Sequence, residues 1–363
     1  MLKNPRRQFL AQTAALAAAP LFSGVVTGQT PGRKLGVALV GLGNLSTGQI
    51  APALQKTRNC RLAGIVTGSP SKAADWKQKY GLSDKSIYDY KSMGRMADNK
   101  DIDIVYVVTP NALHLDHALA AAAAGKHVFC EKPMEISVDR CQQMIDAVKK
   151  AGKMLGVGYR CQFDPNHLEC VRLAHEKVLG DVKVIDANFG FAIGDPTQWR
   201  LKRELAGGGS LMDVGIYCLQ TTRMLTGEEP IWISATEVKT DAVKFKEVDE
   251  TVSWQTKFPG GVVTQCTSTY AANGLTGFRA ATTRGSFGLE PAYFYTGNRG
   301  KRSDGAEINF QVPDQFALEL EDFADCIINK RPTKVPGEMG LQDVKYLTAI
   351  YESIKKGRPV SLI

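Results

Sequence analysis

The stretch from residue 35 to residue 56 constrains the fold of this chain more than any other. An apolar, β-rich run leads into the pattern Gly41-x-Gly43-x-x-Ser46, and residues 45–56 then follow with a helical pattern. Gly41 permits a tight turn, and Gly43 lets the backbone approach a pyrophosphate on the free N–H groups of the new helix. Ser46 replaces a usual third Gly or Ala with another small residue. This context predicts a dinucleotide-binding Rossmann domain. The predicted cofactor contacts here are Gly41, Gly43, Asn44, Leu45 and Ser46.

The end of the next predicted strand, residues 61–66, indicates which dinucleotide binds. Proteins that select NAD usually place Asp or Glu there to bind the ribose 2′-hydroxyl. This chain instead has Thr67 and, five residues later, Lys72, which would attract a 2′-phosphate. We therefore predict NADP rather than NAD. The alternative is that Lys72 is a solvated lysine in the first turn of a helix that ends near Tyr80.

Strands and helices continue to alternate up to residue 158. Strands are predicted at 103–108, 127–130 and 154–158, and helices at 111–124 and 137–150. This alternation predicts a doubly wound parallel sheet, which we assign to residues 33–158.

Two of these strands end in polar residues. After the first come Thr109 and Pro110, then Asn111, which is placed to cap the next helix, and His114 in its first turn. A solvated or capping role for His114 is as good an interpretation as a cofactor contact.

The second of these strands ends in Glu131, Lys132 and Pro133. Open α/β sheets bind ligands at the carboxyl ends of their strands, and Pro133 stops the strand there. Lys132 is therefore a candidate catalytic group. The alternative is a salt bridge in the loop between Glu131 and a nearby cation.

Together, the glycine turn, the Thr109-Pro110-Asn111-x-x-His114 motif and Glu131-Lys132-Pro133 resemble the oxidoreductase family named for glucose-fructose oxidoreductase, inositol dehydrogenase and the rhizopine-catabolism proteins. Further motifs resemble the glucose-fructose oxidoreductase branch: Tyr159-Arg160, Trp199-Arg200 and residues 204–217. The resemblance covers nearly the whole chain after the N-terminal segment. It implies an N-terminal Rossmann domain and a C-terminal α+β domain, residues 159–363, whose large, mostly antiparallel open sheet holds the substrate.

The pattern of the second half agrees with that implication. Alternating or β-branched segments occur at 182–191, 231–239, 250–258, 261–270 and 277–290, and helical patterns at 314–329 and 340–356. Too few helices follow to cover both faces of so wide a sheet, so we predict a homo-oligomer.

Asp213 and Tyr217 are four residues apart and would share one face of a helix. From the residues alone, Ser210 and Asp213 also fit a capping box that starts this helix, with Tyr217 an ordinary buried tyrosine. The resemblance favours a catalytic role, because the Asp-x-x-x-His motif of the family aligns here, with Tyr in place of His as in this branch.

The resemblance also implies a mechanism. Tyr217 would act as the base on the C1 hydroxyl of an aldose, Lys132 would lower the pKa of the phenol, and Asp213 would bind the sugar and orient Lys132. Tyr159 would contact the substrate. The remaining predicted cofactor contacts are Thr67, Lys72, Thr109, Pro110, Asn111, His114, Glu131, Lys132, Arg160, Trp199 and Arg200.

In that branch, NADP stays bound while glucose becomes gluconolactone and a second sugar is reduced, fructose giving sorbitol. An NADP-dependent aldose 1-dehydrogenase or an aldose-aldose oxidoreductase with exchangeable cofactor is the alternative, since the arm before Arg33 is short. A sugar-binding protein that has lost turnover is a further alternative.

The first 32 residues resemble a twin-arginine export signal. Arg6 and Arg7 precede an Ala-rich stretch that is too short and too polar for the roughly 20 apolar residues of a membrane span. We therefore predict a periplasmic protein, exported folded. The net charge of +8 is spread without basic runs, which disfavours nucleic-acid binding. The eight cysteines are scattered, so buried free thiols are predicted rather than disulfides, and no metal site is expected.

Overall fold

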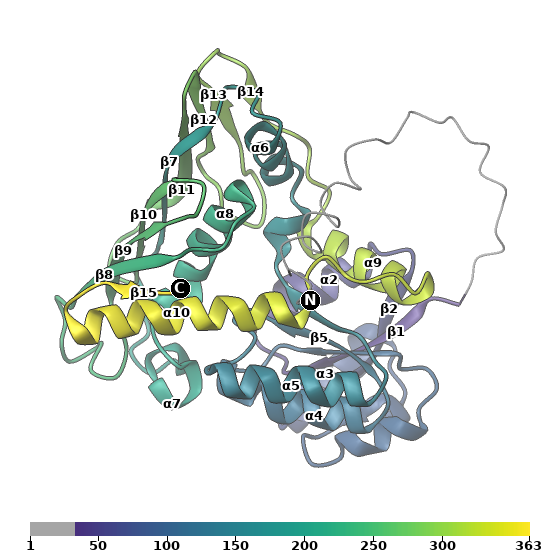
Figure 1. Cartoon of the computed structure of the whole chain (residues 1–363). Coiled ribbons are helices and arrows are strands. Elements are labelled where there is room, and N and C mark those ends of the chain that lie inside the picture. Colours follow the sequence, from purple (N-terminus) through teal and green to yellow (C-terminus); the bar gives the residue numbers. More distant parts are fainter. Residues whose placement is uncertain (1–32) are drawn as a thin grey trace, which may run out of the picture. The chain divides into compact units, whose positions relative to one another are not determined.

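A computed structural model describes residues 33–363 (Figure 1). The predicted export signal, with Arg6 and Arg7, lies outside these residues. The first half contains a six-stranded parallel sheet of order β3-β2-β1-β4-β5-β6. The strands are β1 (Leu35–Val40), β2 (Cys60–Val66), β3 (Ile87–Tyr88), β4 (Ile104–Val107), β5 (His127–Glu131) and β6 (Leu155–Gly158). The predicted doubly wound sheet is confirmed.

Helices connect these strands. They are a π-helical turn (Ser46–Ile50) continued by α2 (Ala51–Leu54), then α3 (Pro70–Tyr80), α4 (His114–Ala123) and α5 (Val138–Lys150). Single 3-10 turns occur at Asp84–Ser86, Met93–Asp98 and Asn111–Leu113. Helix α5 shows why these segments fold as they do. Cys141, Met144, Ile145 and Val148 lie at helical spacing and are its buried residues, and Ser137 caps its first turn.

The second half contains a nine-stranded sheet of order β14-β13-β12-β11-β7-β10-β9-β8-β15. Its strands are β7 (Val182–Gly190), β8 (Trp232–Val238), β9 (Thr251–Lys257), β10 (Val263–Thr269), β11 (Thr276–Thr282), β12 (Gly285–Leu289), β13 (Gly300–Arg302), β14 (Glu307–Ile308) and β15 (Val360–Ser361). Only β7 and β10 pair in parallel, so the mostly antiparallel sheet is confirmed. The single strand predicted at 277–290 is wrong, because Thr283 and Arg284 turn the chain into a hairpin.

Helices cover one face of this sheet (Figure 1). They are α6 (Pro165–His175), α8 (Ile216–Thr226) and α10 (Gly337–Lys356). The second half also contains α7 (Arg203–Ala206) and α9 (Gln315–Ile328). A 3-10 turn, Arg160–Phe163, precedes α6, another spans Trp199–Leu201, and a π-helical turn, Leu211–Gly215, leads into α8. Helix α8 contacts β7 and β10, and α10 contacts β8.

The last two long helices also contact the first sheet. Helix α9 contacts β2, and its Phe323 ring lies 4.8 Å from that of Phe129 on β5. Helix α10 contacts α5 and β6. The boundary predicted at residue 158 falls at the end of β6 and stays a prediction.

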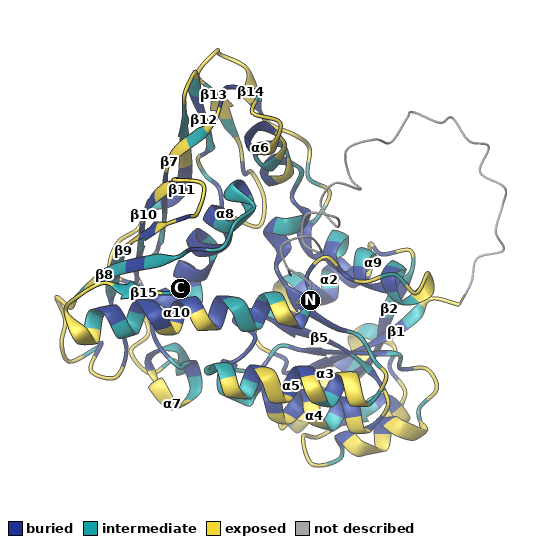
Figure 2. Ribbon diagram, viewed as in Figure 1, coloured by how far each residue is buried: buried dark blue, intermediate teal, exposed yellow. Residues whose placement is uncertain are grey.

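The other face of the large sheet is mainly polar, with Val184, Val238 and Val263 exposed among its polar side chains. Gln255 and Gln265 hydrogen-bond across it at 2.9 Å, as do Ser253 and Thr267, and Figure 2 shows the mixed exposure of these strands. All eight cysteines are buried and free, as predicted. None of the helices within residues 33–363 is both long and apolar enough to cross a membrane.

Candidate active site

The glycine turn is built for a close approach by a ligand. Gly41 has a φ of +91°, and an added Cβ would lie 2.9 Å from the Thr109 methyl group, so no larger residue fits. Gly43 differs, because a Cβ there would meet no atom within 4 Å. The Ser46 hydroxyl donates to the Gly41 carbonyl at 2.6 Å and ties the helix to the turn. Asn44 and Leu45 begin that helix, so its free N–H groups face the open side of the turn.

Lys72 reaches the same turn from the end of β2. Its Nζ donates to the Leu42 carbonyl at 3.0 Å, although Lys72 lies in the first turn of a separate helix, α3, which Ser69 caps. The Thr67 hydroxyl accepts from the Ser69 N–H at 3.2 Å and shapes the connection. Lys72 is exposed in the first turn of this helix, as the alternative states, but its contact with the Leu42 carbonyl places its ammonium at the glycine turn. The turn, the helix start and this cation together fit a dinucleotide that carries an additional phosphate.

His114 links the ends of β4 and β5. It is fully buried, with Nε2 2.8 Å from the Thr109 carbonyl oxygen and Nδ1 3.1 Å from that of Pro133. The solvated and capping interpretations are both wrong. Burial lowers its pKa to about 4, so the ring is neutral at neutral pH. His114 thus holds the Lys132 loop in place.

Two neighbours of His114 differ from expectation. Asn111 does not cap α4, because a 3-10 turn intervenes, and its Nδ2 donates to the Ala206 carbonyl at 2.9 Å. His117 was missed: its Nδ1 lies 3.0 Å from the Thr109 hydroxyl, and its ring stacks on Tyr90. Its spacing of three residues from His114 was the available signal.

Glu131 pairs with a tyrosine, not a cation. The Tyr106 hydroxyl lies 2.6 Å from Oε1 of Glu131 and 3.2 Å from Oε1 of Glu319 on α9, and all three side chains are buried. The salt-bridge alternative is wrong, because no ion pair joins Glu131 to a cation within the described residues. Burial raises the pKa of both carboxyls, and the negative charge of Glu131 raises that of Glu319 further.

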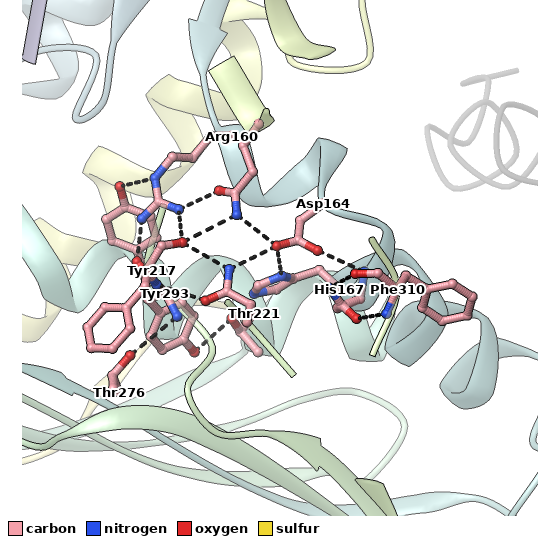
Figure 3. Close-up of polar contacts among 12 residues, drawn as sticks. Arg160, Asp164, His167, Tyr217, Thr221, Thr276, Tyr293 and Phe310 are labelled. Atoms are coloured by element: carbon pink, nitrogen blue, oxygen red, sulfur yellow. Dashed lines mark hydrogen bonds and ion pairs between the residues drawn. The ribbon is translucent and has the colours of Figure 1, made fainter. Parts of the chain in front are cut away.

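Lys132 meets Asp213 and Tyr217, as predicted. Its Nζ lies 2.7 Å from the Asp213 carbonyl oxygen, 3.2 Å from Oδ1 and 4.7 Å from the centre of the Tyr217 ring. Asp213 holds Nζ over the ring face, so Lys132 does not bond to the phenol oxygen, and its effect on the pKa of the phenol stays a prediction. The cation bonded to that oxygen is Arg160, whose Nε donates to it at 3.1 Å (Figure 3). Burial raises the pKa of Tyr217 above its ordinary range, although Arg160 acts in the opposite direction.

Asp213 is the hub of this group. Besides Lys132 it accepts from Arg200 Nε at 3.0 Å and from the Tyr270 hydroxyl at 2.9 Å. Burial would raise its pKa, but Arg200 and Lys132 hold it well below its ordinary value, so Asp213 is ionised. These contacts indicate that the Asp213 carboxylate orients the two cations.

The capping-box alternative for Asp213 is wrong. Ser210 already has helical backbone angles and makes no capping hydrogen bond, and its hydroxyl contacts Asp249 and Ser268 instead. Asp249 also accepts from the Gly209 N–H at 2.7 Å, and a Cβ at Gly209 would lie 2.0 Å from the Asp249 carbonyl oxygen. The glycine run thus serves close packing against Asp249.

Tyr159 and Trp199 lie near the reactive group in different ways. Tyr159 lines a small cavity with Lys132 and Tyr217, but its hydroxyl donates to Asp343 of α10. The Trp199 ring lies 4.6 Å from the Arg200 guanidinium carbon and so supports the cation that binds Asp213. Among residues 33–363, no cluster of His, Cys, Asp or Glu is arranged to hold a metal ion.

Two family models match more than half of this chain. Residues 35–159 match the family described as "Oxidoreductase family, NAD-binding Rossmann fold", and residues 167–288 match the GFO/IDH/MocA C-terminal domain. The D-xylose 1-dehydrogenase [NADP(+)] of Haloarcula marismortui is 32% identical over 334 residues, which cover 90% of this chain and 92% of that protein.

Solved structures are also similar. The aldose-aldose oxidoreductase from Caulobacter crescentus complexed with glycerol is 40% identical with a TM-score of 0.88, covering 91% of this chain and all of that one. A levoglucosan dehydrogenase in complex with NADH and L-sorbose, 22% identical with a TM-score of 0.78, shares the fold over 91% of this chain and 99% of its own.

Proposed function

This chain belongs to the Gfo/Idh/MocA oxidoreductase family, and from that premise we propose that it is an NADP-dependent sugar oxidoreductase that oxidises an aldose at C1 to the lactone. The observation that carries the proposal is the position of the Lys132 ammonium, between the Asp213 carboxylate and the Tyr217 ring at the carboxyl end of β5. The identity of 40% with an aldose-aldose oxidoreductase and of 32% with an NADP-dependent xylose dehydrogenase supports the substrate class and the cofactor.

The residues of the chain divide the chemistry among them. The glycine turn and Lys72 would hold NADP, which would supply the hydride acceptor for C1. Lys132 would donate a hydrogen bond to the C1 oxygen and stabilise the negative charge that develops there. Asp213 fixes Lys132 and is not itself protonated. Tyr217 would take the hydroxyl proton during oxidation and return it during reduction of a second sugar.

We propose an aldose as the second sugar, with a ketose such as fructose as the alternative, and a cofactor that stays bound between the two half-reactions. The relative at 40% identity supports the aldose. The second candidate is an aldose 1-dehydrogenase that releases NADPH, which the xylose dehydrogenase relative supports.

Purified protein distinguishes these candidates. After gel filtration without added nucleotide, bound cofactor should remain visible in the absorbance spectrum and should become reduced when an aldose is added. A second aldose or a ketose should then reoxidise it. Loss of the nucleotide on the column, with turnover restored by added NADP, would favour the dehydrogenase. No aldose-dependent reduction in either format would reject the proposal.

We further propose export through the twin-arginine route to the periplasm and assembly as a homo-oligomer through the polar sheet face. Replacing Arg6 and Arg7 with lysine should trap the protein in the cytoplasm, and continued export would reject that route. Light scattering on the purified protein should give more than one chain mass, whereas a monomer at micromolar concentration would reject assembly.

A further inference from the structure

Arg160 is a buried cation without a carboxylate partner. Its side chain is nearly inaccessible, with 3% of the residue exposed. No carboxylate oxygen of the described residues lies within 4.0 Å of its guanidinium nitrogens, in contrast to Arg223, which pairs with Glu229 and Asp343. A buried charge is costly unless another charge or several hydrogen bonds compensate it. The hydrogen-bond partners of Arg160 therefore indicate which group its charge stabilises.

Those partners hold the guanidinium from three sides. Nη1 donates to the Phe294 carbonyl at 3.1 Å and to Oε1 of Gln315 at 2.5 Å, and Nη2 donates to the Tyr293 carbonyl at 2.6 Å. All these acceptors are neutral. The remaining bond, from Nε, goes to the Tyr217 oxygen (Figure 3). Tyr217 is thus the partner in this set that can become an anion.

The nearest acid along the network is compensated elsewhere. Gln315 Nε2 donates at 2.8 Å to Oδ2 of Asp164, so a neutral amide separates that carboxylate from Arg160. Asp164 lies 3.5 Å from His167 Nδ1. Although burial lowers the pKa of His167, Cys161 and Asp164 raise it to about 9, so the ring carries a charge that matches Asp164. Arg160 therefore has no carboxylate in direct contact, although, against the raising effect of burial, His167 and Arg160 lower the pKa of Cys161, the next residue.

From these contacts we infer that Arg160 is the positioning residue that stabilises the deprotonated form of Tyr217 during sugar oxidation. When the O–H bond of the sugar breaks, a new O–H bond forms on Tyr217, and Arg160 fixes the phenol oxygen before and after that transfer. The inference rests on the proposed function, because it assigns Tyr217 as the base.

Other charges and titratable groups also lie around the phenol. They are Lys132 over its ring, Glu131 at the end of β5, Asp213 on the preceding turn, Cys161 beside Arg160, and Tyr295, whose ring lies 4.8 Å from the Arg160 guanidinium carbon. Cys161 is the serious competitor, because a thiolate there would compensate Arg160.

The test compares kcat as a function of pH in the wild type, Arg160→Gln, Arg160→Lys and, as a control, Cys161→Ser. Removing a neighbouring opposite charge shifts a pKa by about one to three units. In Arg160→Gln the midpoint of the rise of kcat with pH should move up by about that amount, with little change in KM, and Arg160→Lys should lie between. Cys161→Ser should not move the midpoint.

A fluorinated tyrosine at position 217 provides the second readout. Its phenol is more acidic, so it should restore part of the rate that Arg160→Gln loses at neutral pH. A merely structural role for Arg160 predicts no rescue and an equal loss at every pH, and either result overturns the inference. A midpoint shift in Cys161→Ser equal to that in Arg160→Gln would also overturn it.

Two further measurements distinguish failure of this inference from a folding defect and from failure of the proposed function. If circular dichroism shows that Arg160→Gln is unfolded, the profile of Arg160→Lys with and without the fluorinated tyrosine decides. If the wild type reduces no cofactor with any aldose, the proposed function fails. The pairing can then still be tested by ultraviolet titration. The titration of Tyr217 is the difference between a protein with Tyr217 and its Tyr217→Phe variant, measured once in the wild type and once in the Arg160→Lys background. An identical titration of Tyr217 in the two backgrounds rejects the pairing.

Discussion

At the residue scale, the charged groups of the site have most of their hydrogen-bonding atoms engaged with one another. Asp213 binds Lys132, Arg200 and Tyr270, so its carboxylate is committed to orienting cations. The Lys132 ammonium uses two bonds on Asp213, which leaves one of its three N–H donors for a ligand. The sequence motif identifies these residues, and the contacts assign their roles.

Cofactor choice is a prediction about a single residue. Lys72→Glu should weaken NADP binding relative to NAD by about tenfold or more, because a charge-assisted contact with the 2′-phosphate contributes about 1.5–3 kcal/mol. Binding of each nucleotide, measured by fluorescence titration, checks this. Lys79→Glu, at the other end of the same helix, is the matched control and should leave the ratio unchanged. An unaltered ratio in Lys72→Glu would reject the assignment.

At the element scale, both halves of the site begin with a widened helical turn. The π-helical turns Ser46–Ile50 and Leu211–Gly215 carry the residues next to the glycine turn and Asp213 itself. Such turns are rare in proteins, and those that occur often lie at functional sites. Hydrophobic periodicity predicts a helix at both places but does not distinguish π from α geometry.

The glycine turn yields a paired prediction. Gly43→Ala should weaken NADP binding by about tenfold or more, since its methyl group enters open space needed for backbone hydrogen bonds to the pyrophosphate, while the free energy of unfolding changes little. Gly41→Ala should instead lower the free energy of unfolding by about 1–3 kcal/mol because of its positive φ. Calorimetry and nucleotide titration measure both. Equal effects of the two substitutions on binding and stability would contradict the division of roles.

The contact between α9 and the first sheet gives a pH dependence. Tyr106 has one hydroxyl proton for two carboxyls, so the pair retains an additional proton, and the pKa of Glu319 is raised well above its ordinary value. A raised folded pKa stabilises the protein below the unfolded value, near 4.3, and that contribution is lost as the pH rises toward the folded pKa.

The substitution Glu319→Gln removes the carboxyl and therefore the loss of stability that its ionisation causes at high pH. The free energy of unfolding of this variant should fall less steeply with pH than that of the wild type, and at alkaline pH it should exceed the wild-type value by about 1–3 kcal/mol. Denaturant unfolding at several pH values checks this, with the exposed Glu307→Gln as the control. Parallel curves for wild type and Glu319→Gln would show that the carboxyl is already ionised.

At the scale of the whole molecule, local patterns predict the order of strands and helices, because burial imposes a period on each segment. They do not predict which distant segments meet. Glu319 lies 213 residues from Tyr106, and Gln315 lies 155 residues from Arg160. Helix α9 brings both into the site, and no spacing in the sequence signals this. The contact between Arg160 and Tyr217 was therefore missed, whereas Lys132, Asp213 and Tyr217 were placed through their motifs.

The central claim is that one ammonium from the first half and one phenol from the second half act together on a sugar. Reduction of bound NADP by an aldose, followed by absorbance in wild type, Lys132→Ala and the exposed-site control Lys91→Ala, tests it most directly. We expect Lys132→Ala to keep its nucleotide and lose about 10²–10³-fold in rate, the usual cost of removing one donor to a developing oxyanion, while Lys91→Ala matches the wild type. A Lys132→Ala variant that reduces its cofactor at the wild-type rate would contradict the account.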